Sequence, residues 1–228
     1  MSNSVELHQM NIAKTQQLSA RILRLWLEPQ QPFSHQAGDY IMLGLDAQQR
    51  KPFSIANAPT DDGLIELHVR NQDDSEWMQQ LFALPVGAQL WVEDAKPQYR
   101  LQAETELNLF IAGGTGIAPM QALLQARIQQ GIQQPTYLYW GTHSIEECYI
   151  NAELQALSAA HPQLHYISVI SEPSADWNGP SGLVHEYALS QHSDVSNASV
   201  YLCGCWPMVQ QAKQDFIQAG LPASRYQP

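Results

Sequence analysis

Cysteine is scarce in this 228-residue sequence. The three cysteines, Cys148, Cys203 and Cys205, are odd in number and lack the spacing of a disulfide framework or of the four thiolates that hold an iron–sulfur cluster. The sequence therefore predicts that the chain carries no such cluster. Sparse cysteines without an even pattern also favour a reducing compartment, so we expect the protein in the cytoplasm.

Basic residues are few as well. Lysine and arginine together number 11 against 22 aspartates and glutamates, which gives a formal net charge of −11 and a pI near 5.0. Nucleic acids and anionic membranes bind clustered cations, so we expect neither as a partner. A site for an anionic cofactor must then be built locally, from backbone amides and a few side chains.

Long apolar runs are missing too. A run such as residues 109–112 is far shorter than the roughly 20 residues that span a bilayer. Residues 1–8 show no cationic stretch followed by an apolar one, so we expect no signal peptide. The eight histidines include no helical pair that encloses a glutamate, and we assign no metal site.

The first hundred residues have a hydrophobic period of two. Apolar and polar residues alternate along residues 23–28 and 65–70, which is typical of antiparallel strands with one apolar face. Further strands are predicted at residues 37–43 and 51–57, and a helix at residues 75–84, where Met78, Leu81 and Phe82 have helical spacing. About six short strands with one helix indicate a small closed antiparallel barrel.

A polar stretch at residues 102–106 separates this half from one with a different pattern. Buried strands are predicted at residues 107–112, 137–140, 165–170 and 200–203, and helices at residues 119–130, 152–160 and 208–219, with Gly220 suited to end the last helix. Such alternation is typical of a doubly wound parallel sheet. The predicted fold class is therefore β followed by α/β, with a barrel domain at residues 1–101 and an α/β domain at residues 107–228.

A glycine-rich segment, Gly113-Gly114-Thr115-Gly116, lies between the first buried strand and the first helix of the second half. Glycines at this point let the backbone approach a pyrophosphate, and a helix start favours an anion. Pro119 suits a first helical turn, where its missing amide proton costs nothing. Glycines also serve plain turns, and for the segment alone this alternative stays open. Its position at the carboxyl end of a strand in an α/β sheet favours nucleotide binding.

Three more segments place polar or reactive side chains at strand ends. Pro52 cannot donate in a sheet, so we expect an edge strand on which Phe53 and Ser54 can face a ligand. Trp140-Gly141 and Cys203-Gly204, the latter followed by Met208, end two strands at the same crevice. Each segment alone has a structural alternative, a strand with a proline turn for the first and a small buried hydrophobe for Cys203.

Taken in order, Pro52-Phe53-Ser54, residues 113–119, Trp140-Gly141 and Cys203-Gly204 with Met208 resemble the ferredoxin–NADP reductase superfamily. Within it the sequence is most similar to the bacterial NAD(P)H:flavin reductases, including those of luminous bacteria. The resemblance covers nearly the whole chain, and the ordered set of motifs is specific although each motif alone is not. It implies a six-stranded flavin-binding barrel followed by a dinucleotide-binding domain.

The resemblance also implies roles for individual residues. Phe53, Ser54 and the backbone after them would hold the flavin ring, residues 113–116 would take the dinucleotide phosphates, and Cys203-Gly204 would lie beside the nicotinamide. Ser54 and Cys203 are the implied catalytic residues. The implied cofactors are NADH or NADPH and a flavin (FMN, FAD or riboflavin). The full implied cofactor-binding set is Lys51, Pro52, Phe53, Ser54, Ile55, His68, Val69, Gly113, Gly114, Thr115, Gly116, Pro119, Trp140, Gly141, Cys203, Gly204 and Met208.

The sequence departs from the family pattern at three places. Lys51 stands where relatives often have an arginine that binds flavin phosphate or ribityl groups. Asp73 and Asp74 fall where many relatives have glycine and serine against the flavin pyrophosphate, and their carboxylates would repel a phosphate. Relatives usually end in an aromatic-rich strand, whereas this sequence ends at residues 225–228, so either the flavin site is more open or the end of the protein is missing. All three departures favour a flavin bound loosely, as a substrate.

Three functions stay open at this point. The first is a flavin reductase that supplies reduced flavin to an oxygenase, a luciferase-type enzyme or ferric iron. The second is an electron-transfer flavoprotein that reduces a partner protein or ferric iron, and the third is a non-catalytic flavin- or nucleotide-binding module. The weak phosphate site and the missing cluster favour the first. Residues 141–149 contain two glutamates and no lysine or arginine, so we expect NADH to be preferred over NADPH unless this loop points elsewhere.

Overall fold

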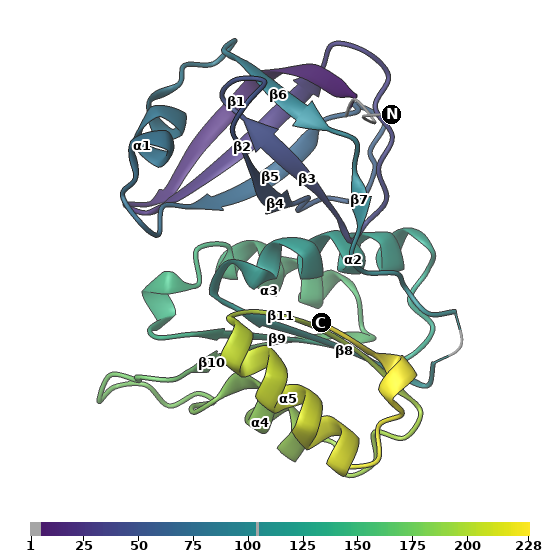
Figure 1. Ribbon diagram of the computed structural model, residues 1–228. Helices are drawn as coiled ribbons and strands as arrows, with labels where there is room; N and C mark the ends of the chain where they lie inside the picture. Colours follow the sequence, from purple (N-terminus) through teal and green to yellow (C-terminus); the bar gives the residue numbers. More distant parts are fainter. Residues whose placement is uncertain (1–5, 104) are drawn as a thin grey trace. The chain divides into compact units, whose positions relative to one another are not determined.

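The strands of the first hundred residues form an antiparallel sheet in the order β4-β3-β6-β1-β2-β5, with β7 beside β3 (Figure 1). The structure is a computed structural model that describes residues 6–103 and 105–228. The strands are β1 (Leu7–Ser19), β2 (Ile22–Pro29), β3 (Asp39–Gly44), β4 (Arg50–Ser54), β5 (Ile65–Arg70), β6 (Gln89–Glu93) and β7 (Lys96–Pro97). The predicted helix is α1 (Glu76–Ala83), capped by the Ser75 side chain.

The two end strands of this order meet, so the sheet closes into the predicted six-stranded barrel. Just after β4, Ile55 bridges Leu67 of β5, and the Ala56 amide donates to the Glu66 carbonyl over 2.8 Å. The inward-facing side chains, among them Met10, Leu25 and Ile41, are fully buried. The exposed proline of β4 lies on an end strand of the order, as its missing donor predicts.

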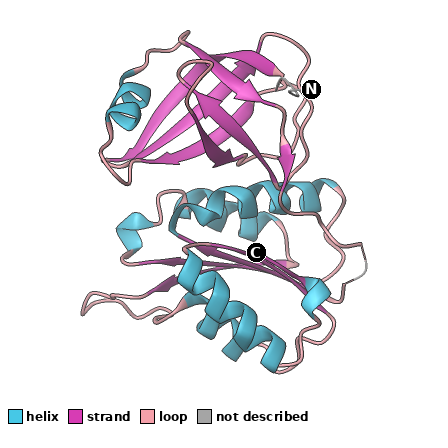
Figure 2. Ribbon diagram, viewed as in Figure 1, coloured by secondary structure: helices cyan, strands magenta, loops and turns pink. Residues whose placement is uncertain are grey.

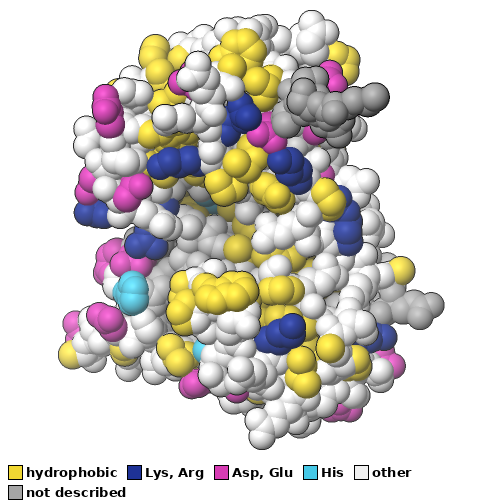
Figure 3. Space-filling view, in the orientation of Figure 1, with side chains coloured by type: hydrophobic (Ala, Val, Ile, Leu, Met, Phe, Trp, Pro, Cys, Tyr) yellow, Lys and Arg dark blue, Asp and Glu magenta, His cyan; other side chains and the backbone are white. Residues whose placement is uncertain are grey.

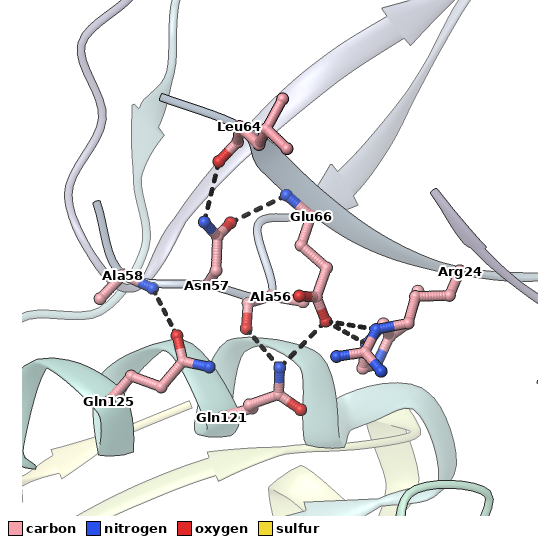
Figure 4. A network of polar contacts seen from close by, with 9 residues as sticks. Arg24, Ala56, Asn57, Ala58, Leu64, Glu66, Gln121 and Gln125 are labelled. Carbon is pink, nitrogen blue, oxygen red and sulfur yellow. Dashed lines mark hydrogen bonds and ion pairs between the residues drawn. The ribbon is translucent and has the colours of Figure 1, made fainter. Parts of the chain in front are cut away.

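Strand β5 differs from the expectation of one buried face, because residues 65–69 are all buried. Its polar face carries Glu66 and His68, whose Oε1 and Nε2 atoms lie 2.8 Å apart. Figure 4 shows the network around Glu66: Arg24 Nε donates to Oε1 over 2.8 Å and Gln121 Nε2 over 3.0 Å. Burial acts to raise the pKa of Glu66, but the hydrogen bonds and charges of His68 and Arg24 outweigh it and hold that pKa below its ordinary value.

The second half is a parallel sheet in the order β10-β9-β8-β11-β12, with α2 and α3 on one face and α4 and α5 on the other (Figure 2). The predicted doubly wound fold is therefore confirmed. Its strands are β8 (Leu107–Gly113), β9 (Thr136–Thr142), β10 (Leu164–Ile170), β11 (Ala198–Cys203) and β12 (Tyr226–Gln227). Its helices are α2 (Ile117–Gln129), α3 (Asn151–Ala160), α4 (Val184–Ser190) and α5 (Trp206–Gln218). Gly220, with a φ of +100°, follows the last helix.

The chain divides into two compact units. The first contains the described residues up to Arg100 together with Gln121–Ala126 from the middle of α2, and the second contains the rest. Residues 121–126 of α2 belong to the first unit because their side chains are hydrogen-bonded to it. Gln121 donates to the Ala56 carbonyl over 3.0 Å, and Gln125 accepts from the Ala58 amide over 3.0 Å (Figure 4). The domain bounds of 1–101 and 107–228 stay a prediction.

On the face drawn in Figure 3, lysine and arginine side chains stand singly among acidic and uncharged ones. No helix in the described ranges is both long and apolar enough to cross a bilayer. Nor do those ranges contain a group of three or more His, Cys, Asp or Glu that could hold a metal ion.

Candidate functional site

The first candidate surface lies on β4 and is here called the edge-strand site, comprising residues 51–55 with His68 and Val69. Phe53 is half-buried and stacks on Trp77 of α1, with ring centroids 6.1 Å apart. Ser54 is half-buried, and within the described part of the chain its hydroxyl makes no hydrogen bond. An unpaired hydroxyl on a strand that has only one ladder neighbour is available to a ligand.

Three predicted members of this site have buried side chains. Ile55 and Val69 are fully buried in the barrel core, and His68 is held against Glu66. Their side chains therefore fix the strands, and only their backbone groups could touch a ligand. The side chains of this site that a ligand could reach are those of Lys51, Pro52, Phe53 and Ser54.

The second candidate surface lies where the strand order of the parallel sheet reverses, and is here called the switch-point site. From β8 the chain passes to β9 on one side, whereas β11 lies on the other side, so the crevice at the carboxyl ends of β8 and β11 is the topological switch point. Gly113 ends β8 and Gly114 and Thr115 follow it, all three half-buried. Cys203 ends β11 and Gly204 follows it. The fold thus brings together two motifs that are about 90 residues apart in sequence, at the place where doubly wound sheets bind ligands.

Glycine is required in this crevice because the two loops are in contact. A Cβ atom at Gly116 would collide with the Cys203 carbonyl, and one at Gly113 would lie 2.9 Å from the Met208 sulfur and 3.5 Å from the Gly204 Cα. Gly114 has a φ of +54°, in the left-handed region that favours glycine. Gly116 therefore serves the packing of α2 on β11, and the half-buried residues 113–115 remain for ligand contact.

Trp140 of β9 is hydrogen-bonded to the glycine segment at residues 113–116. Its side chain is 0 % exposed, and its Nε1 donates to the Gly114 carbonyl over 2.8 Å. Gly141, next in β9, is packed so closely on α4 that a Cβ atom would lie 2.7 Å from the Val184 side chain. Pro119 is buried in the first turn of α2. These residues hold the glycine segment in shape, and their side chains are not exposed to a ligand.

Sequence reasoning missed two features near the sites. Trp206, the first residue of α5, is 70 % exposed only three positions after Cys203. An exposed tryptophan is rare enough to be a signal, and its place after a strand end could have drawn attention. Asp73 was predicted to repel a phosphate, but its pairing with Lys51 at 3.6 Å was not foreseen.

Two family models match the chain. The oxidoreductase FAD-binding domain matches residues 9–99, and the oxidoreductase NAD-binding domain matches residues 110–214. The edge-strand site lies within the first match and the switch-point site within the second.

Known proteins agree with this division. The chain is 34% identical over 206 residues to the CDP-6-deoxy-L-threo-D-glycero-4-hexulose-3-dehydrase reductase of Yersinia pestis, covering 90% of this chain but only 62% of that protein. It is 32% identical to a protein of Vibrio harveyi named "Probable flavin reductase" (90% and 91% covered) and 29% identical to the NAD(P)H-flavin reductase of Aliivibrio fischeri (87% and 87%). Among solved structures, the ferredoxin reductase in carbazole 1,9a-dioxygenase superposes with a TM-score of 0.86 at 19% identity, covering 100% of this chain and 70% of that one.

Proposed function

The chain belongs to the flavin reductase family of FAD- and NAD-binding oxidoreductases, and we propose that it is an NAD(P)H:flavin oxidoreductase whose flavin arrives and leaves as a substrate. In this reaction NAD(P)H gives up a hydride and the flavin takes it up with a proton, yielding NAD(P)+ and reduced flavin. The observation that carries the proposal is the presence of both cofactor domains in one chain.

The flavin and the nicotinamide supply the redox chemistry, and the chain's own residues bind and orient them. On the edge-strand site, Phe53 and the backbone of β4 would hold the flavin ring. The free Ser54 hydroxyl would donate to a ring nitrogen that gains charge. Lys51 is the cation of this site.

On the switch-point site, the backbone amides of residues 113–115 would bind the dinucleotide phosphates. The Ile117 amide at the start of α2 already donates to the Gly114 carbonyl, and Pro119 has no amide proton. Cys203 and Gly204 at the end of β11 would lie beside the nicotinamide, with Met208 filling the space over Gly113 and Gly204. Trp140 acts through the Gly114 carbonyl and is therefore a positioning residue.

The reduced flavin would pass to an acceptor such as a flavin-dependent oxygenase, a luciferase-type enzyme or ferric iron.

All three cysteines are free thiols, which supports the cytoplasm as the compartment.

A second candidate is an electron-transfer component that keeps its flavin and reduces a partner protein. It is favoured by the longer Yersinia relative, a reductase named for a dehydrase, of which the chain spans 62%.

An assay of NADH oxidation, with and without added flavin, separates the two. We expect the rate of the purified protein to depend on added flavin and to saturate with it. A yellow protein that oxidises NADH and reduces an artificial acceptor without added flavin would support the second candidate instead, and no oxidation under either condition would refute both.

A further inference from the structure

Lys51, the cation of the edge-strand site, is paired with the carboxylate of Asp73. Lys51 Nζ lies 3.6 Å from Asp73 Oδ2, 3.3 Å from the Ser75 hydroxyl and 5.0 Å from the centre of the Trp77 ring. Lys51 and Phe53 are two positions apart on β4 and both contact Trp77, so they share a face of the strand. The ammonium group is thus beside the ring that Phe53 also touches.

Asp73 is fixed in this place from its other side. Its Oδ1 accepts from the Ser75 amide over 3.1 Å, and the Ser75 hydroxyl accepts from the Met78 amide over 3.4 Å at the start of α1. The hydrogen bond from the Ser75 backbone holds the pKa of Asp73 below its ordinary value, so the carboxylate is charged at neutral pH. Both the ammonium group and the start of α1 therefore face a carboxylate of the chain itself.

FMN and riboflavin differ only by a phosphate, which carries a nearly double negative charge at neutral pH. A free lysine on the flavin-binding face would favour the phosphorylated molecule by charge-assisted contact. A lysine whose charge is matched by a neighbouring carboxylate offers a phosphate little net attraction. The other nearby carboxylate, Asp74, lies 3.6 Å from Arg21 and does not pair with Lys51.

We propose that Asp73 is a specificity-determining residue that serves as the internal counter-anion of Lys51 and makes the site indifferent to the flavin phosphate. The substrate class is then a flavin recognised by its ring and ribityl chain, with riboflavin bound about as tightly as FMN. This inference rests on the proposed function, because it assumes that β4 binds a flavin.

Quenching of flavin fluorescence, measured without NADH, tests the proposal on the whole chain. In the unaltered protein we expect dissociation constants for riboflavin and FMN within about a factor of three of each other, because the Asp73 carboxylate matches the charge of Lys51. Asp73→Asn should tighten FMN relative to riboflavin by about three- to tenfold, and the gain should shrink at high salt.

Asp74→Asn is the matched control, because it removes the same charge one residue away. It should leave the FMN-to-riboflavin ratio unchanged, and Lys51→Gln added to Asp73→Asn should abolish the gain. An unmoved ratio in Asp73→Asn, or an equal shift in Asp74→Asn, would overturn the role of Asp73 while leaving the proposed function intact. Failure of the unaltered protein to bind either flavin would overturn both.

Discussion

Replacing Trp140 by phenylalanine separates dinucleotide binding from flavin binding. The change keeps an aromatic ring in the sheet but removes the Nε1 group that donates to the Gly114 carbonyl over 2.8 Å. Gly114 is half-buried, so water can partly replace the lost donor, and we expect a local cost of about 1 kcal/mol. If that cost falls on the binding conformation of residues 113–116, the KM for NADH rises about fivefold.

The smaller ring also leaves a cavity, because Trp140 is among the largest fully buried side chains, and we expect a further loss of about 1–3 kcal/mol in the free energy of unfolding. Global stability must therefore be measured separately, by urea unfolding followed by circular dichroism. Trp177→Phe is the control, since its Nε1 donates to the Pro180 carbonyl over 3.0 Å in another loop of the same unit. It should leave both Michaelis constants unchanged.

Steady-state kinetics with NADH and flavin varied in turn complete the test. We expect Trp140→Phe to raise the KM for NADH and to leave the KM for flavin within a factor of two. An unchanged KM for NADH in a folded protein, or an equal rise in both constants, would refute the role assigned to Trp140.

Four further outcomes are expected. Ser54→Ala should lower turnover about ten- to a thousandfold, the scale of one donor to developing charge, and turnover equal to that of the unaltered protein would remove Ser54 from the mechanism. Gly116→Ala should destabilise the chain by about 3 kcal/mol or more in urea unfolding, because its Cβ would collide with the Cys203 carbonyl, whereas Gly63→Ala, which meets nothing within 4 Å, should cost about 1 kcal/mol. Burial lowers the pKa of His185, so the unfolded chain binds more protons there and stability should fall as pH drops below about 6.5; His185→Gln should lessen that fall. NADH should have a higher kcat/KM than NADPH at a pH of about 8, and a clear NADPH preference would mean that the acidic loop after β9 does not face the adenosine ribose.

Gly116 is a poor position at which to test NADH binding. Gly116 is buried, and a Cβ atom there would collide with the Cys203 carbonyl. Loss of NADH binding in a Gly116 variant would therefore report misfolding as well as lost contact. Thr115, which is half-buried beside it, is the better position for a binding test.

The preference for NADH has local support. Glu146 and Glu147 are exposed in the loop after β9, beside the strand that leads into the glycine segment. His143, the only group there that could become cationic, has its Nδ1 3.4 Å from Glu172 Oε1, so a carboxylate already faces it. We expect the additional ribose phosphate of NADPH to meet negative charge in this loop.

The sequence predicted the architecture well where periodicity was strong. Alternation along residues 23–28 and continuous apolar runs such as residues 107–112 fixed the two sheet types, because burial of one face or of both leaves a direct mark on the pattern. Strands β1, β6, β7 and β12 and helix α4 were not predicted at their positions. Helix α4 has only seven residues, and β12 has two, so neither has enough turns or alternations to show a period.

The sequence predicted the motifs of the candidate sites. It did not predict which of their residues are accessible to a ligand and which hold the site in place. The sequence could not show that Trp140 donates to the Gly114 carbonyl or that His68 is held against Glu66. Both contacts depend on groups that are distant in the chain, the Gly114 carbonyl for the first and Arg24 and Gln121, through Glu66, for the second. Likewise, the sequence shows Asp73 only as an acidic residue of a polar segment. Its pairing with Lys51 depends on the fold of the turn before α1.

The central claim is that flavin leaves the protein after it is reduced. The most direct measurement is anaerobic reduction of excess flavin by NADH with a small amount of protein, followed by ultrafiltration and the absorbance of the filtrate. The account predicts that many equivalents of flavin per protein are bleached and that reduced flavin passes the filter. Bleaching of no more than one equivalent, with the flavin retained above the filter, would contradict it.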